Sequence, residues 1–230
     1  MVGNLFILVV SWFLLRLERK QLGPVLGVSN PMYRLFQFGM GFSSTAILAI
    51  LTSLVFALTA NFTWVPTGSA TLEYLLKGFY NVFNAVLFEE LIFRGYLLYK
   101  ALEYLGERKA CFLSAGAFGV YHWFTFSTFG NPVLMGWVFF YTGVWGLMFA
   151  YAYTKTRSLA LPIGLHLGWN LVDQYIFSKT SLSLFEPVTT IHTRYLGTLE
   201  SMMFLNLPTI GFAVLVILLL SKVQGRYSTR

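Results

Sequence analysis

The chain of 230 residues is long enough for one domain, and its composition excludes an ordinary soluble one. Hydrophobic residues make up 57% of the sequence and charged residues only 11%, with a mean hydropathy of +0.66. The net charge of +7 comes without a basic cluster interleaved with aromatic residues, which argues against nucleic acid as a partner. The single cysteine, Cys111, excludes an intramolecular disulfide framework and a cysteine-based metal site. We therefore expect one integral-membrane domain over residues 1–230, with membrane lipid as a partner.

Apolar runs of roughly the length that a bilayer requires recur along the chain. The first, at 2–15, is of marginal length. We interpret it as a short or tilted span, since it lacks the leading cations and the small-residue cleavage site of a signal peptide. The other expected spans cover 38–60, 72–100, 110–126, 133–153, 159–177 and 203–220. The sequence thus predicts an all-α, polytopic transmembrane helix bundle of about seven spans. The expected connections include an uncharged turn region at 61–71, a charged loop at 100–109 and a polar stretch at 178–201.

The lysines and arginines are distributed very unevenly between the expected loops. The loops after the first, third, fifth and seventh spans hold twelve of them: Arg16, Arg19, Lys20, Arg34, Lys100, Arg108, Lys109, Lys155, Arg157, Lys222, Arg226 and Arg230. The alternate loops hold only Lys179 and Arg194. Because cytoplasmic loops carry the excess of cations, we expect the N-terminus outside and the C-terminus in the cytoplasm. The expected location is the plasma (inner) membrane of a prokaryote.

Two adjacent carboxylates, Glu89 and Glu90, and the nearby Arg94 interrupt the third apolar run. Ionisable groups within a membrane are expensive and usually face a partner or a wet cavity. Glu90 and Arg94 are spaced i, i+4, so they pair along one helix face, and we expect a structural role for this pair. Adjacent residues of a helix diverge by about 100°, so Glu89 points elsewhere and has no local counter-ion. Glu89 is therefore the strongest candidate for a functional residue.

Three further polar residues lie deep in other spans. His122 belongs to the fourth, whereas His166 and Asn170 lie one turn apart on one face of the sixth. At a rise of about 1.5 Å per residue from the cation-rich ends, Glu89 lies roughly 16 Å deep, His122 and Asn170 roughly 18 Å, and His166 roughly 12 Å. We therefore expect one shared site, opening to the cytoplasm.

These residue types suit the hydrolysis of a peptide bond. A carboxylate in apolar surroundings can act as the base that activates water, and an imidazole can pass the proton to the leaving amine. An imidazole and an amide on one helix face can stabilise the oxyanion. We assign the first two roles to Glu89 and His122 and the third to His166 with Asn170. Zinc held by Glu89, His122 and His166 remains an alternative, since catalytic zinc sites have three protein ligands and a water.

At this point three motifs resemble those of a known family. Glu89-Glu90-Leu-Ile-Phe-Arg94 fits EExxxR, Phe118-Gly-Val-Tyr-His122 fits FxxxH, and His166-Leu-Gly-Trp-Asn170 fits HxxxN. In this order, and within membrane spans, they resemble the CAAX proteases and bacteriocin-processing enzymes (CPBP) family. The type II CAAX-prenyl endopeptidases belong to that family.

The resemblance implies an intramembrane endopeptidase with its catalytic core at 72–177. It implies that Glu89 and His122 activate water, that His166 and Asn170 bind the oxyanion, and that Glu90 and Arg94 support the site. It also implies a metal-free glutamate mechanism without a cofactor, although the family was formerly classed as metalloproteases. The expected partner is a peptide or protein substrate, with its lipidation left open.

Two other functions remain open from the sequence. Buried carboxylates and imidazoles also build relays, so a non-enzymatic proton- or cation-coupled transporter is the main alternative. Against it, the sequence has neither an inverted repeat nor paired broken helices. The other is a catalytically dead partner of a sensor or secretion system, which the complete motif set disfavours.

Overall fold

Helices dominate the structure, a computed structural model that describes residues 1–68, 71–178, 183–197, 200 and 202–223. The α-helices are α1 (Val2–Leu17), α2 (Leu22–Leu26), α3 (Pro31–Ala60), α4 (Leu72–Arg94), α5 (Tyr96–Thr125), α6 (Pro132–Thr156), α7 (Ala160–Leu171) and α9 (Leu207–Lys222). Two π-helices follow the same path, η1 (Val172–Ile176) directly after α7 and η2 (Met202–Asn206) directly before α9. The all-α class expected from the sequence is thus confirmed.

Three described helical stretches are long and apolar enough to cross a membrane. They are Leu22–Ala60, Pro132–Thr156 and Phe204–Lys222. The apolar helix α1 has only 16 residues and α7 only 12, whereas α4 carries several charges along its length. The chain is therefore an integral membrane protein by its helices, while the count of seven spans and the orientation of the termini stay predictions.

Two expected boundaries around the carboxylate pair are wrong. The helix expected at 72–100 ends at Arg94, because the backbone breaks at Gly95, where a Cβ atom would lie 2.3 Å from the carbonyl oxygen of Leu91. The charged loop expected at 100–109 is helical and belongs to α5. A kink at Gly106, with φ of 75°, divides α5 into a short first part and the part that carries His122. Glycine permits this left-handed backbone without the strain of a side chain.

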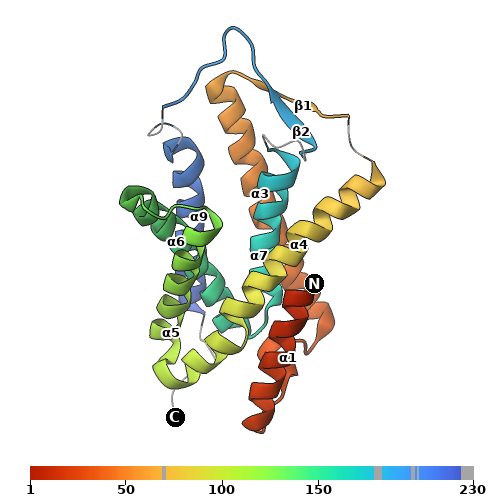
Figure 1. The fold of residues 1–230 in the computed structure, drawn as a ribbon, viewed down its shortest axis with the longest axis vertical. Coiled ribbons are helices and arrows are strands. Elements are labelled where there is room, and N and C mark those ends of the chain that lie inside the picture. Colours follow the sequence, from red (N-terminus) through yellow and green to blue (C-terminus); the bar gives the residue numbers. More distant parts are fainter. Residues whose placement is uncertain (69–70, 179–182, 198–199, 201, 224–230) are drawn as a thin grey trace.

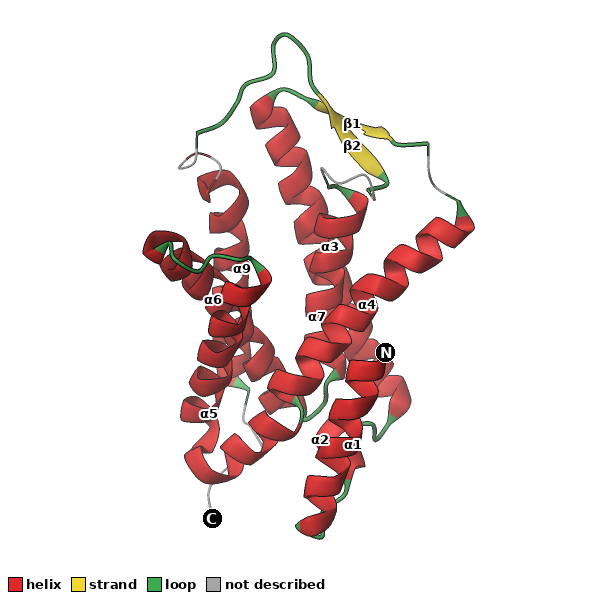
Figure 2. Ribbon diagram, in the orientation of Figure 1, coloured by secondary structure: helices red, strands yellow, loops and turns green. Residues whose placement is uncertain are grey.

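The polar segments expected to be irregular contain a small sheet. The strands β1 (Thr63–Pro66) and β2 (Phe185–Val188) pair antiparallel, with Thr63 opposite Val188 and Pro66 opposite Phe185. They lie at one end of the bundle, beyond the end of α3 (Figure 2). Four-residue strands so far apart in the sequence leave no periodic pattern to recognise. We call this the sheet end; it also contains the first residues of α4, α6 and α9.

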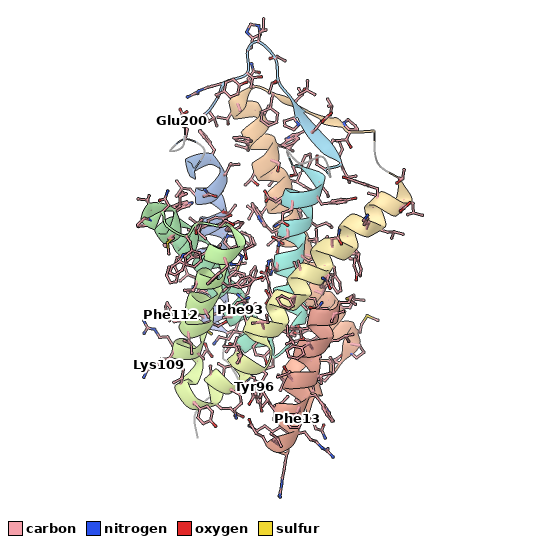
Figure 3. The ribbon with its side chains drawn as sticks, viewed as in Figure 1. Phe13, Phe93, Tyr96, Lys109, Phe112 and Glu200 are labelled. Carbon is pink, nitrogen blue, oxygen red and sulfur yellow. The ribbon has the colours of Figure 1, made fainter. Side chains whose placement is uncertain are left out.

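The opposite end holds most of the positive charges, and we call it the basic end. The C-terminal end of α1 meets the first turns of α5 there, where Lys100 Nζ donates to Glu18 Oε2 at 2.6 Å. The C-terminal end of α6 meets the start of α3, where Arg34 Nη1 donates to the carbonyl oxygen of Thr156 at 2.9 Å. In Figure 3 the labelled Tyr96 and Lys109 lie toward this end, and Glu200 lies at the other.

Helix α7 packs against α3 at very short range (Figure 1). A Cβ atom at Gly164 would lie 2.3 Å from the carbonyl oxygen of Phe38, and one at Gly168 would lie 2.2 Å from that of Phe42. Small residues four apart let two helix backbones approach closely, which is the main means of association within lipid. Because His166 lies between the two glycines, the same contact fixes the height and rotation of the helix that carries the HxxxN motif.

We predict that Gly168→Ala destabilises the protein by about 1–3 kcal/mol, because the added methyl group overpacks the contact with Phe42. The measurement is thermal unfolding in detergent. Gly39→Ala is the matched control on α3, since a Cβ atom there meets nothing within 4 Å. It should be neutral or slightly stabilising, as alanine suits a helix better than glycine. Equal melting temperatures for the two variants would contradict the assigned packing.

An ion network ties α1 to the first turns of α5. Glu18 accepts hydrogen bonds from Lys100 and, at 2.9 Å, from the hydroxyl of Tyr96, while Lys20 and Lys100 both contact Glu103. The hydrogen bond from Lys100 is the largest of the effects that lower the pKa of Glu18 to about 2. The hydrogen bond to Glu103 raises the pKa of Lys100.

This network predicts an acid-dependent loss of stability. The pKa of Glu18 is lowered from 4.5 to about 2 in the folded state, so its contribution is complete above pH 4.5 and is lost as the pH falls toward 2. The difference in melting temperature between wild type and Glu18→Gln should therefore shrink across this range. Glu73→Gln, at the exposed start of α4, should show no such trend. A constant difference for Glu18→Gln would contradict the assignment.

Candidate active site

A cavity of about 630 Å³ brings together the four candidate catalytic residues. Glu89 of α4, His122 of α5, and His166 and Asn170 of α7 all line it. They come from three helices, as expected from the sequence, and the aromatic residues Phe118, Trp145 and Trp169 line much of the rest. The cavity is therefore a largely apolar pocket with a few convergent polar groups, the usual form of a ligand site.

The two adjacent carboxylates occupy different environments. Glu89 faces the cavity, and its Oε2 atom is buried without a hydrogen-bond partner. Glu90 points away into the protein interior and is 0% exposed. This divergence is the one that helical geometry requires of neighbouring residues.

Glu90 connects α4 to α7 through a buried ion network. Its Oε1 atom lies 3.2 Å from Nη1 of Arg94 and 2.8 Å from Nδ1 of His166. The pair with Arg94 agrees with the i, i+4 prediction, whereas the bond to His166 was not foreseen. Because a carboxylate can only accept, Nδ1 of His166 is the protonated nitrogen, and Nε2 is left facing the cavity.

Arg94 is 0% exposed and is held from several directions. Its Nη2 atom donates to the carbonyl oxygen of Gly146 on α6 at 3.0 Å. The guanidinium carbon lies 4.2 Å from the ring centre of Phe118 and 5.1 Å from that of Phe149, within the range of cation–π attraction. Phe118 of the FxxxH motif thus covers the arginine of the EExxxR motif.

His122 is oriented by its own helix. Its Nδ1 atom lies 2.8 Å from the carbonyl oxygen of Phe118, so Nδ1 carries the proton and donates. The opposite nitrogen, Nε2, therefore has a free lone pair directed toward Glu89. A fixed tautomer of this kind is what a proton acceptor in catalysis requires.

Three polar atoms converge at the centre of the site. Oε2 of Glu89 lies 4.0 Å from Nε2 of His122 and 3.8 Å from Nε2 of His166. These distances are too long for direct hydrogen bonds and suit a water molecule bridging the groups. The arrangement joins a carboxylate and two imidazoles around one position for a small reacting molecule.

The cavity also has polar lining residues that were not singled out as catalytic. Tyr141 and Thr142 contribute hydroxyl groups from α6. Asp173 lines the cavity with Gln174, because η1 continues α7 in the wider π-helical form. The spacing of three residues between Asn170 and Asp173 is the sequence signal that could have placed both side chains on one face of the helix. π-Helical turns are frequent at functional sites.

The zinc alternative stays a prediction. Among the described residues, no group of three or more His, Cys, Asp or Glu side chains is arranged to hold a metal ion. Zinc ligands lie about 2.0–2.2 Å from the metal, which brings them closer together than Glu89 lies to the two histidines here.

The expected opening of the site requires a correction. The cavity extends from Glu89 toward the sheet end, where Phe126, Asp173 and Asn206 line it. The cation-rich segments, which the charge rule places in the cytoplasm, lie at the other end. An outside N-terminus and a site opening to the cytoplasm therefore cannot both be true. Depth counted along the helices from one end does not reveal which end of a pocket is open.

The buried network predicts different outcomes for two substitutions. Arg94→Met removes the partner of Glu90 and should cost about 3–5 kcal/mol of stability, because an unpaired buried charge remains. The double variant Arg94→Met with Glu90→Gln should regain stability in thermal unfolding. It should not regain activity, because His166 then lacks the carboxylate that orients it. Equal stability of the single and double variants would contradict the pairing.

Comparison with protein families agrees with these motifs. Residues 71–172 match the family model described as "Rce1-like: Type II CAAX prenyl endopeptidase Rce1-like". No curated protein and no solved structure matches the chain. The matched segment contains all three motifs, so the recognition of the family from the sequence is confirmed. The family supports, in general, a CAAX-protease-like intramembrane endopeptidase that acts on a peptide or protein. Over residues 71–172, the chain is thus similar to the Rce1-like type II CAAX prenyl endopeptidases, the family recognised from the three motifs.

Proposed function

We propose that the protein is an endopeptidase of the prokaryotic plasma membrane that hydrolyses a peptide bond with a water molecule activated by Glu89. The observation that carries the proposal is the approach of Glu89 Oε2 to the Nε2 atoms of His122 and His166 inside one cavity. The catalytic core is proposed to comprise residues 72–177 of a single domain. A transporter is not favoured, since the family match points to a protease.

Glu89 and His122 would bind the attacking water as a pair. Both Oε2 of Glu89 and Nε2 of His122 are hydrogen-bond acceptors, so each can take one hydrogen of the same water. The oxygen lone pair then points toward the substrate carbonyl. Glu89 removes a proton as the water oxygen bonds to the carbonyl carbon. That proton passes through Glu89 or His122 to the leaving amine as the carbon–nitrogen bond breaks.

His166 and Asn170 would stabilise the oxyanion that forms on the carbonyl oxygen. Asn170 offers its amide group. His166 would donate from Nε2 when that nitrogen carries a proton, while its Nδ1 atom donates to the buried carboxylate of Glu90 and fixes the orientation of the ring. Glu90 and Arg94 thus act as positioning residues, since neither lines the cavity. A fixed donor of this kind typically contributes about 10²–10³ to the rate.

The proposal predicts that Glu89→Gln lowers turnover by about 10²–10⁴, because the amide retains the shape of the side chain but cannot accept the proton. His122→Ala should produce a loss of the same order. The measurement is cleavage of quenched fluorescent peptides, with and without a prenyl group, by purified enzyme in detergent. Glu73→Gln, a matched substitution on the same helix, should leave turnover unchanged.

Retention of full turnover by both Glu89→Gln and His122→Ala would reject the mechanism. A chelator separates the proposed reaction from a zinc-dependent one. Activity that collapses on chelation and returns with one metal would establish a metalloprotease, whereas the glutamate mechanism predicts no effect. Glu89-dependent ion flux in liposomes without proteolysis would establish a transporter.

A further inference from the structure

The lining of the catalytic cavity extends from Glu89 toward the sheet end. Beyond Glu89 and His122 its lining continues through exposed residues at the ends of helices, namely Thr125, Phe126, Asp173 and Gln174. Leu205 and Asn206, directly before α9, complete this part of the wall. Each of these residues lies nearer to the sheet end than the catalytic atoms do.

Buried side chains close the cavity on the opposite side. Glu90 and Arg94 are 0% exposed and lie one and five residues after Glu89, in the direction of the basic end. Behind them the side chains of Cys111, Met148 and Phe149 are at most 1% exposed. None of the described residues that line the catalytic cavity belongs to the cation-rich segments of the basic end.

The two ends differ strongly in charge. Ten described cations belong to the basic end: Arg16, Arg19, Lys20, Arg34, Lys100, Arg108, Lys109, Lys155, Arg157 and Lys222. Two described cations, Lys77 and Arg194, belong to the sheet end. The sheet end also contains the acidic residues Glu73, Asp173, Glu186 and Glu200. The end at which the catalytic cavity opens is thus the cation-poor end.

We infer that the catalytic cavity opens on the side of the membrane away from the cytoplasm, and that its substrate is a peptide segment presented on that side. The orientation follows from the excess of cations at the basic end, which marks the cytoplasmic face of a membrane protein. The statement about the substrate rests in addition on the proposed function. Because buried residues close the cavity toward the basic end, a cytoplasmic protein tail does not reach Glu89.

The orientation can be tested without any catalytic assay. Single cysteines are introduced into a Cys111→Ala background, which removes the buried natural thiol. Gln174→Cys reports on the cavity mouth, His192→Cys on the sheet end and Tyr104→Cys on the basic end. Intact cells of a bacterial host are treated with a membrane-impermeant maleimide, before and after permeabilisation.

The inference predicts that Gln174→Cys and His192→Cys react in intact cells, and that Tyr104→Cys reacts only after permeabilisation. The reverse pattern overturns the orientation. If His192→Cys reacts in intact cells but Gln174→Cys reacts only after permeabilisation, the cavity does not open outward, and the inference is equally overturned. Tyr104 and His192 lie outside the catalytic cavity, so Tyr104→Cys and His192→Cys should also remain active.

A second measurement tests the substrate side. New peptide N-termini are mapped by mass spectrometry in host cells that express the wild type or Glu89→Gln. The inference predicts that the Glu89-dependent termini fall in extracytoplasmic segments of membrane or secreted proteins. Glu89-dependent cleavage confined to cytoplasmic segments overturns the inference and leaves the proposed protease intact. Outward labelling without any Glu89-dependent cleavage rejects the proposed protease and leaves the orientation standing.

Discussion

The buried contact of Glu90 with both Arg94 and His166 is the interaction on which the rest of the site depends. Three charged or polar side chains from two helices are removed from solvent, and the carbonyl oxygen of Gly146 adds a third helix. Breaking such a cluster on one side costs several kcal/mol, roughly 3–5, so the three helices are held in one arrangement. This explains the different tasks of two adjacent glutamates. Glu90, whose charge is paired with Arg94, organises the site, and Glu89 is left free for chemistry.

Close backbone contact gives this network its precision. The ring of His166 can meet both Glu90 and Glu89 only if α7 has one height and one rotation, and Gly164 and Gly168 against α3 supply that constraint. Within lipid there is little hydrophobic driving force between helices, so packing and hydrogen bonds must determine their relative positions. The helix that carries the HxxxN motif therefore meets two requirements. Gly164 and Gly168 pack against α3, whereas His166 and Asn170 face the cavity.

The sequence revealed the residues of the site more fully than their connections. The pairing of Glu90 with Arg94 follows from helix geometry alone, and the exclusion of Glu89 from that pair follows with it. The contact of Glu90 with His166 depends on the rotation of one helix against another, which no local pattern encodes. The break at Gly95 and the pairing of β1 with β2 were missed for a related reason. Each depends on a tertiary contact rather than on hydrophobic periodicity. Asp173 was not singled out from the sequence, because a π-helix changes which residues share a face.

The side on which the cavity opens is set by a part of the sequence that the chemistry does not involve. Hydrolysis by Glu89 needs a water, a peptide and fixed donors, and none of these distinguishes one face of a membrane from the other. The orientation depends instead on the charges of the loops. A membrane potential of 100 mV changes the energy of each charge that is moved across the membrane by about 2.3 kcal/mol. A family can therefore retain its three motifs while a different distribution of lysine and arginine turns the same site toward the other compartment. In this chain the cations gather at the closed end of the cavity, so the charge distribution that inserts the protein also determines which substrates can reach Glu89.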